Sequence, residues 1–187
     1  MDIVLFGIQG SGKGTQAKRL AAEFGYDIFE AGGELRTIAA SGSELGTTVK
    51  SFIDAGNLVP HLIIMQVVRE AIAQRPKDQK ILFDGIPRDI FQMRDFDAIM
   101  RDAGRDFRCI HLLLSPEEGM KRILGRAKIE GRADDADTKI IEKRMKTFTE
   151  KTMPVIKEYQ EKGKVTEIEG MKGVEEVYQE MREALSS

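Results

Sequence analysis

Ile3-Val4-Leu5-Phe6-Gly7-Ile8-Gln9-Gly10-Ser11-Gly12-Lys13-Gly14-Thr15 runs an apolar segment directly into a glycine-rich loop that contains a lysine. Apolar residues at positions 17, 20, 21 and 24 then share one helix face, and Gly25 follows as a stop signal. A strand, a glycine-rich loop and a helix together make a phosphate-binding loop, in which backbone N–H groups and the helix dipole point at one anion. We therefore expect the phosphates of a nucleotide to lie against Gly10, Ser11, Gly12, Lys13, Gly14 and Thr15.

The remainder of the chain alternates between strand and helix signals. Candidate strands lie at residues 3–6, 27–29, 80–84, 108–114 and 164–168, with amphipathic segments between them. The last long segment, from Asp137 to a stop at Gly163, predicts a helix kinked at Pro154. Such alternation is typical of an α/β fold, here a five-stranded parallel sheet flanked by helices in one domain spanning residues 1–187. Residues 30–60 and 125–135 fit the alternation poorly and are expected to be insertions that carry binding surfaces.

Composition excludes several classes of protein. The 187 residues are 41% hydrophobic and 32% charged, which is the balance of a folded domain rather than a disordered chain. A net charge of −2 argues against nonspecific nucleic-acid binding. The single cysteine, Cys109, excludes an intramolecular disulfide and a cysteine-based zinc site. The early apolar run is too short for a signal peptide or a membrane span, so we expect a cytoplasmic protein with no membrane partner, and nothing in the sequence calls for more than a monomer.

A second motif lies at the end of the predicted strand 80–84. Ile81-Leu82-Phe83 ends in Asp84, and Gly85-Ile86-Pro87-Arg88 follows. An acid at the end of a buried strand beside a phosphate loop is where a water-mediated Mg²⁺ ligand is expected. The hydroxyl of Thr15 is the second candidate, although the strict motif places Ser or Thr directly after the lysine and Gly14 intervenes here.

These motifs and several others resemble the adenylate kinase family of nucleoside monophosphate kinases. The resemblance covers nearly the whole chain and rests on residues 7–16, Gly32 with Leu35-Arg36, 57–60, 84–88, Gln92, Gly125-Arg126, Gly131-Arg132 with Asp134-Asp135, and Lys143-Arg144. It implies a P-loop NTPase fold whose core binds ATP, whose helical flap at about residues 30–59 binds the monophosphate, and whose short lid at about 125–135 closes over both. A zinc-bearing long lid would need cysteines that this segment lacks, so no zinc is expected.

The resemblance also implies roles for individual residues. Lys13, Arg88, Arg126, Arg132 and Arg144 would be catalytic, and Arg132 and Arg144 would bridge the two phosphates. Arg122 would lie against the ATP base, Arg126 would reach in from the lid, and the backbone at Lys172 would touch the adenine. The AMP-binding residues would be Ala31, Arg36, Asn57, Leu58, Val59, Gly85, Ile86, Pro87, Arg88, Gln92, Arg132 and Arg144.

The expected reaction transfers the γ-phosphoryl group of ATP to AMP, in line, with Mg²⁺ as the cofactor. The two substrates bring about six negative charges together, which favours bidentate arginines. The acceptor is a phosphate oxygen that is largely deprotonated at pH 7, so no general base is required.

The match is weakest at residues 30–33. The family usually carries Ser-Thr-Gly-Asp there, whereas this chain has Glu30-Ala31-Gly32-Gly33. Uridylate/cytidylate kinases often have alanine at position 31, so a UMP/CMP kinase is an alternative. Gln92 favours AMP, because it matches the residue that reads adenine in the family. A nucleotide-binding regulatory protein with reduced transfer activity is a third interpretation.

Overall fold

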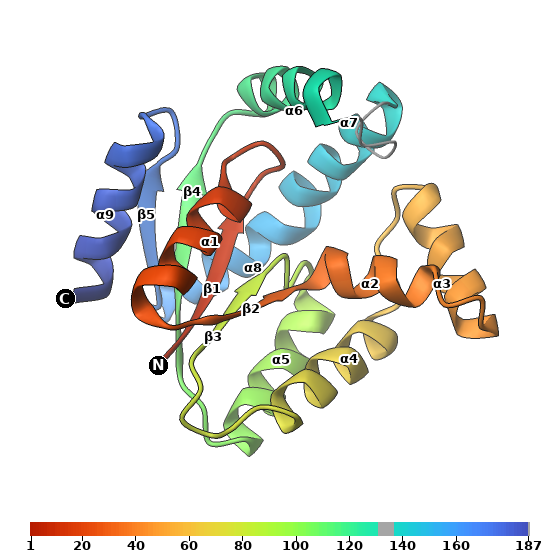
Figure 1. Ribbon diagram of the computed structural model, residues 1–187, viewed down its shortest axis with the longest axis horizontal. Helices are drawn as coiled ribbons and strands as arrows, with labels where there is room; N and C mark the ends of the chain where they lie inside the picture. Colours follow the sequence, from red (N-terminus) through yellow and green to blue (C-terminus); the bar gives the residue numbers. More distant parts are fainter. Residues whose placement is uncertain (131–136, 187) are drawn as a thin grey trace.

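The fold is a five-stranded, all-parallel sheet with helices on both faces (Figure 1). This computed structural model describes the backbone of residues 1–130 and 137–186, and the side chains of these residues except 126–130. In chain order the strands are β1 (Asp2–Gly7), β2 (Asp27–Glu30), β3 (Ile81–Asp84), β4 (Phe107–Leu113) and β5 (Val165–Glu169). Their spatial order is β2-β3-β1-β4-β5. Each of the five strands predicted from the sequence is confirmed.

Alternate residues of the central strands face two separate cores. Val4 and Phe6 of β1 belong to a large core with the apolar faces of α4 (His61–Ala73), α5 (Ile90–Asp102) and α8 (Met153–Glu161). Ile3 and Leu5 face the opposite side, where α1 (Lys13–Phe24) and α9 (Val174–Ser186) cover the sheet. Cys109 of β4 lies in the large core with no exposed surface. All six residues of β1 are buried, as expected for the central strand of a sheet covered on both faces.

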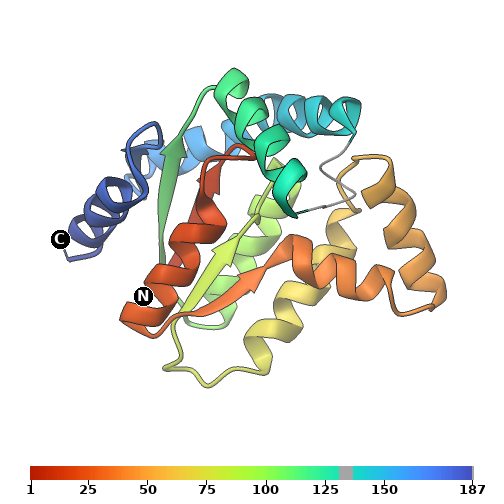
Figure 2. The same ribbon diagram turned by 45° about the horizontal axis from the view of Figure 1, so that its top comes forward.

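Four further helices lie toward the carboxyl ends of the strands. The helices α2 (Ala31–Ala39) and α3 (Glu44–Asp54) extend to one side of the sheet, on the side away from α9 (Figures 1 and 2). The helices α6 (Pro116–Glu130) and α7 (Thr138–Thr147) lie beyond the end of β1 and share a small apolar core there with Ile8. The segment 30–60 therefore holds two short helices after Glu30, α2 and α3, and it interrupts the alternation of strands and helices.

The predicted helix from Asp137 to Gly163 is not one regular α-helix. It consists of α7, a π-helical turn η2 (Phe148–Thr152) and α8, in direct succession. Pro154 follows the π turn at the start of α8. Proline lacks an N–H donor and its ring clashes with the carbonyl four residues earlier in a regular α-helix. The wider π turn makes room for the ring, so the helical run continues through the proline.

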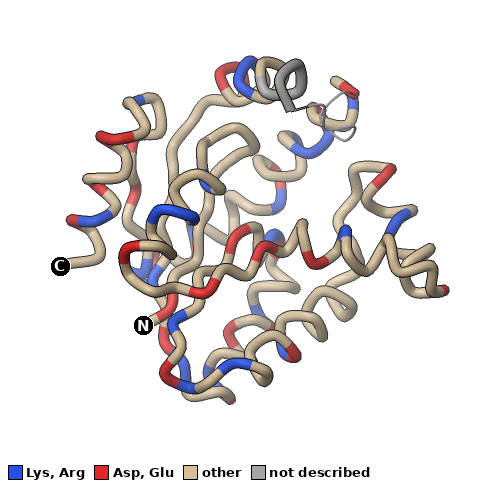
Figure 3. Tube along the Cα trace, in the orientation of Figure 1, with Lys and Arg blue, Asp and Glu red and all other residues tan. Residues whose placement is uncertain are grey.

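Charged residues of both signs are interspersed along most of the chain (Figure 3). Within residues 1–130 and 137–186, no helix is both long and apolar enough to cross a lipid bilayer.

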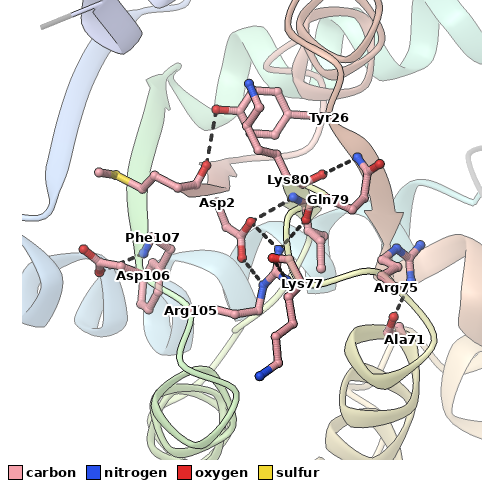
Figure 4. Close-up of polar contacts among 12 residues, drawn as sticks. Asp2, Tyr26, Ala71, Arg75, Lys77, Gln79, Lys80, Arg105, Asp106 and Phe107 are labelled. Carbon is pink, nitrogen blue, oxygen red and sulfur yellow. Dashed lines mark hydrogen bonds and ion pairs between the residues drawn. The ribbon is translucent and has the colours of Figure 1, made fainter.

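A buried ion pair fastens the amino ends of the strands (Figure 4). The carboxylate of Asp2 accepts hydrogen bonds from Nε and Nη2 of Arg105 at 2.6 and 2.8 Å, and from the backbone N–H of Ile81 at 2.9 Å. Arg105 also donates to the carbonyl oxygens of Lys77 and Gln79. Because the side chains of Asp2 and Arg105 are only 3% and 8% exposed, neither charge can be hydrated if its partner is lost.

We expect Arg105→Met to lower the free energy of unfolding by roughly 3 kcal/mol, because it leaves the carboxylate of Asp2 buried without its cation. Urea unfolding followed by circular dichroism measures this change. Arg101→Met is the matched control, since the side chains of Arg101 and its partner Asp102 are 76% and 60% exposed and the pair contributes little. Equal destabilisation by both variants would contradict the assignment.

Candidate active site

A cavity of about 800 Å³ opens at the carboxyl ends of the central strands. Its walls come from the loop after β1, the last residues of β2 and β3, the flanking helices α2 and α6, and the junction of α7 with η2. The chain leaves β1 between β3 on one side and β4 on the other. Ligands of open α/β sheets bind at such a point, where adjacent connections diverge.

The loop after β1 has the backbone conformation of an anion cradle. Gly10 and Gly12 have φ angles of 84° and 92°, in the left-handed region, and Gly12 caps the N-terminus of α1. A Cβ at Gly10 would lie 2.6 Å from the carbonyl oxygen of Gly119, so a larger residue has no room there. The ammonium group of Lys13 folds over the loop and donates to the carbonyl oxygen of Gly7 at 2.7 Å. The buried hydroxyl of Ser11 finds no partner among the described residues, as is common where a ligand binds.

Asp84 lies in the wall of the cavity at the end of β3. Burial raises the pKa of its carboxyl group, and the positive charges of Lys13 and Arg88 oppose that rise. Thr15 lines the same cavity. Within the described residues no three histidine, cysteine or acidic side chains gather as a metal-binding group. One carboxylate and one hydroxyl are oxygen donors that fit Mg²⁺ when substrate phosphates and water supply its other ligands.

Arg88 is held by three hydrogen bonds. Its backbone N–H donates to Oε1 of Gln92 at 2.8 Å, and its carbonyl oxygen accepts from the hydroxyl of Thr152 at 2.8 Å. Its Nε donates to the carbonyl oxygen of Gly85 at 2.7 Å. Burial lowers the pKa of the Arg88 guanidinium, but an arginine remains charged at neutral pH. The cation is therefore fixed in place at the cavity wall, where an anion can reach it.

Gln92 is buried in the first turn of α5. Its backbone N–H donates to the capping carboxylate of Asp89 at 2.8 Å. Because a backbone N–H can only donate, the N–H of Arg88 fixes which end of the Gln92 amide is the oxygen. The two Nε2–H donors of Gln92 are then the part of the side chain left for a ligand, and they suit a ring nitrogen acceptor.

The structure brings nearly all the described site candidates together. Of the residues singled out from the sequence, those that line the cavity are Gly10, Ser11, Gly12, Lys13, Gly14, Thr15, Ala31, Arg36, Asn57, Leu58, Val59, Asp84, Gly85, Ile86, Pro87, Arg88, Gln92, Arg122 and Arg144. Lys172 does not line it, and its ammonium group pairs with Glu180 of α9. The guanidinium of Arg122 donates to Glu118 and to the carbonyl oxygen of Gly170. The side chain of Arg126 and all of Arg132 lie outside the described part of the chain.

Some lining residues carry no sequence motif. Phe148 and Thr152 belong to the helical segment predicted from Asp137 to Gly163, where they lie on one apolar stripe of the helix, and they line the cavity from the π turn. Thr152 is a hydroxyl at a buried position of that stripe, which is the one signal that could have singled it out. The carboxylate of Glu30 also lines the cavity and pairs with Arg36.

Comparison with known proteins places the chain in a family. The family model described as adenylate kinase matches residues 5–164. An adenylate kinase from Maricaulis maris is 38% identical over 178 residues, which are 95% of this chain and 94% of that protein. Adenylate kinases from Thermus thermophilus and Bacteroides fragilis are 36% and 32% identical, over 98% and 100% of this chain and 96% and 99% of theirs. With the P-loop, the five-stranded parallel sheet and the cluster of arginines in one cavity, this similarity shows that the chain belongs to the adenylate kinase family.

Proposed function

We propose that this protein transfers the γ-phosphoryl group of ATP to AMP and yields two molecules of ADP, reversibly and without a covalent enzyme intermediate. The observation that carries the proposal is that Lys13, Arg36, Arg88 and Arg144 line the same cavity as the P-loop and Gln92. A site that only bound ATP would have no use for three arginines in addition to the lysine of the P-loop. The curated relatives are themselves named adenylate kinases.

The ATP phosphates would bind the P-loop, residues 10–15, at the N-terminus of α1. Arg122, which already contacts the backbone at Gly170, would lie against the base of ATP. Lys172 follows in the same turn, and its backbone rather than its paired ammonium would be the part near the adenine. Arg126 would approach the phosphates from a short lid at about residues 125–135.

The monophosphate would bind on the side of the helices α2 and α3, which we assign as the flap at about residues 30–59. Arg36 and Arg88 would hold its phosphate, and Arg132 and Arg144 would bridge that phosphate to the transferred group. Residues 57–59 and 85–87, with Ala31 and Gln92, would enclose the nucleoside. Adenine offers a ring nitrogen that accepts from the Nε2–H of Gln92.

Thr15 and Asp84 would hold Mg²⁺, with Asp84 acting through water. When bound, this ion neutralises charge on the phosphates of ATP. No residue is needed as a general base, because the phosphate of AMP is largely deprotonated at neutral pH. Lys13 and the arginines contribute by aligning donor and acceptor and by stabilising charge on the transferred group. Closure of the site excludes water, which would otherwise compete as the acceptor.

A coupled assay of MgATP-dependent diphosphate formation tests the proposal, with AMP, UMP, CMP and GMP compared in parallel. We expect fast turnover with AMP and little with the others. A preference for UMP or CMP would replace the proposal by pyrimidine nucleotide phosphorylation, with Ala31 outweighing Gln92. ATP binding without turnover of any acceptor would indicate a regulatory nucleotide-binding protein.

The variant Gln92→Ala tests whether Gln92 recognises the base of the acceptor nucleotide. We expect kcat/KM for AMP to fall by about 10²-fold, because the variant leaves an adenine acceptor unpaired and frees the backbone N–H of Arg88. The KM for ATP should change little. Gln66→Ala on the exposed face of α4 is the matched control. An unaltered ratio of AMP to UMP turnover in Gln92→Ala would show that this amide does not select the base.

We further infer that the protein acts in the cytoplasm as a monomer. One chain supplies walls on both sides of the cavity, and its single thiol, Cys109, is buried and reduced. Light scattering of the purified protein should give a mass near 21.0 kDa.

A further inference from the structure

A carboxylate occupies the end of the cavity assigned to the monophosphate. Oε1 of Glu30 lies 2.9 Å from a guanidinium nitrogen of Arg36, and both side chains are about half exposed. Glu30 is the last residue of β2, and Arg36 lies almost two turns into α2. Glu30 and Arg36 both line the cavity.

Two glycines make room for this ion pair. A Cβ at Gly33 would lie 3.2 Å from Oε2 of Glu30, and a Cβ at Gly32 would lie 3.1 Å from Nη1 of Arg36. Neither glycine has a positive φ angle, so the backbone does not require glycine at these positions. The first turn of α2 is thus a bare surface on which the carboxylate and the guanidinium lie against each other. Glu30 and Gly33 are two of the positions at which the chain departs from the usual family pattern.

Glu30 also acts on the other charged groups of the cavity. It is in register with Asp84 on the neighbouring parallel strand β3, so the two side chains leave the sheet on the same face. Burial raises the pKa of Asp84 and lowers the pKa of Arg88, and the negative charge of Glu30 adds slightly to the first shift and slightly opposes the second. The carboxylate therefore adds negative charge to the part of the cavity that Arg36 and Arg88 line.

We propose that Glu30 is a positioning residue that competes with the phosphate group of the acceptor nucleotide for Arg36. This proposal rests on the function proposed above. In the empty site the carboxylate holds Arg36 and partly neutralises it. When the monophosphate arrives, its dianionic phosphate displaces the carboxylate from the guanidinium, and on release the carboxylate returns. The competition weakens AMP binding and eases the departure of the ADP formed at this end of the cavity.

The direction in which KM for AMP changes distinguishes a carboxylate that competes with the phosphate from one that supports phosphate binding. A carboxylate that only oriented Arg36 for the phosphate would strengthen AMP binding, so its removal would raise KM. A competing carboxylate weakens binding, so its removal lowers KM. Arg36 offers five N–H donors, and one of its terminal nitrogens donates to Glu30 while both residues line the cavity. A phosphate bound at Arg36 would therefore draw on the same guanidinium as the carboxylate.

The test is Glu30→Gln and Glu30→Ser, each compared with wild type. We expect KM for AMP to fall roughly fivefold, equivalent to about 1 kcal/mol, as for a half-exposed charge pair. The Kd for AMP, measured by calorimetry without ATP, should fall in parallel. The KM for ATP should stay the same, and the gain should shrink at high ionic strength because it is electrostatic. Serine is included because glutamine can still accept a hydrogen bond from Arg36.

Glu34→Gln is the matched control, because it removes one negative charge from the first turn of α2 at a residue that does not line the cavity. It should leave KM for AMP unchanged. An unchanged or raised KM and Kd for AMP in both Glu30 variants would overturn the proposal. If wild type itself failed to phosphorylate AMP, the proposed function would fail instead. Thermal unfolding of each variant confirms that the fold is intact.

Discussion

Replacing Arg88 by alanine is expected to lower kcat/KM for AMP by roughly 10²- to 10³-fold, which is about 3 to 4 kcal/mol of transition-state stabilisation. The guanidinium is fixed by Gly85, and the backbone around it is fixed by Gln92 and Thr152, so the cation is held in place at the cavity wall before a ligand binds. Loss of a preorganised cation costs more than loss of a mobile one, because the remaining groups cannot rearrange toward the phosphate.

Steady-state kinetics with AMP as the varied substrate measures the effect of Arg88→Ala, and calorimetry with ATP alone shows whether the donor end is intact. Arg94→Ala is the control, since Arg94 is exposed on the same helix α5. Turnover within a few-fold of wild type in Arg88→Ala would refute the role assigned to this arginine.

Lys13→Met should lower kcat by roughly 10³-fold while leaving the protein folded. Methionine approximates the length of the lysine chain and removes its charge and its N–H donors. The ammonium group rests 2.7 Å from the carbonyl oxygen of Gly7, inside the cradle that would receive the phosphates. Without it, one positive charge is missing where negative charge gathers on the transferred group, and the low dielectric of a closed site magnifies that loss.

Single-turnover measurements with saturating MgATP and AMP separate the chemical step of Lys13→Met from weakened binding. Lys157→Met, at an exposed position on α8, controls for loss of a positive charge as such. A variant that loses only affinity for ATP and keeps its rate at saturation would assign Lys13 to binding alone.

The fold could be predicted because its signals are local. Each strand contains apolar or β-branched residues, and the loop from Gly7 to Lys13 marks both the end of one strand and the start of one helix. The order β2-β3-β1-β4-β5 could not be predicted from these signals. It depends on which strand edges pair across long stretches of chain, and a single sequence contains no local trace of that choice.

The residues of the candidate site show the same difference between local and long-range signals. Residues that belong to motifs, such as Lys13, Asp84 and Arg88, could be placed together because parallel strands end at the same edge of the sheet. Thr152 could not be placed in the site from the sequence, because its hydroxyl donates to the carbonyl oxygen of Arg88, 64 positions away along the chain. The ion pair between Glu30 and Arg36 depends on how the two side chains lie over Gly32 and Gly33. The sequence therefore shows that both charged residues are present, but it could not show that their side chains meet.

Cys109 makes this chain convenient for spectroscopy. Its thiol is the only one in the sequence, it has no exposed surface, and burial raises its pKa to about 12. At neutral pH almost none of it is the reactive thiolate, so maleimide reagents should leave it unmodified in the folded protein. A cysteine introduced at an exposed position, such as Ser51 on α3, would then be labelled alone without any prior removal of a native thiol. A fluorophore or spin label there would report how α3 responds when AMP is added.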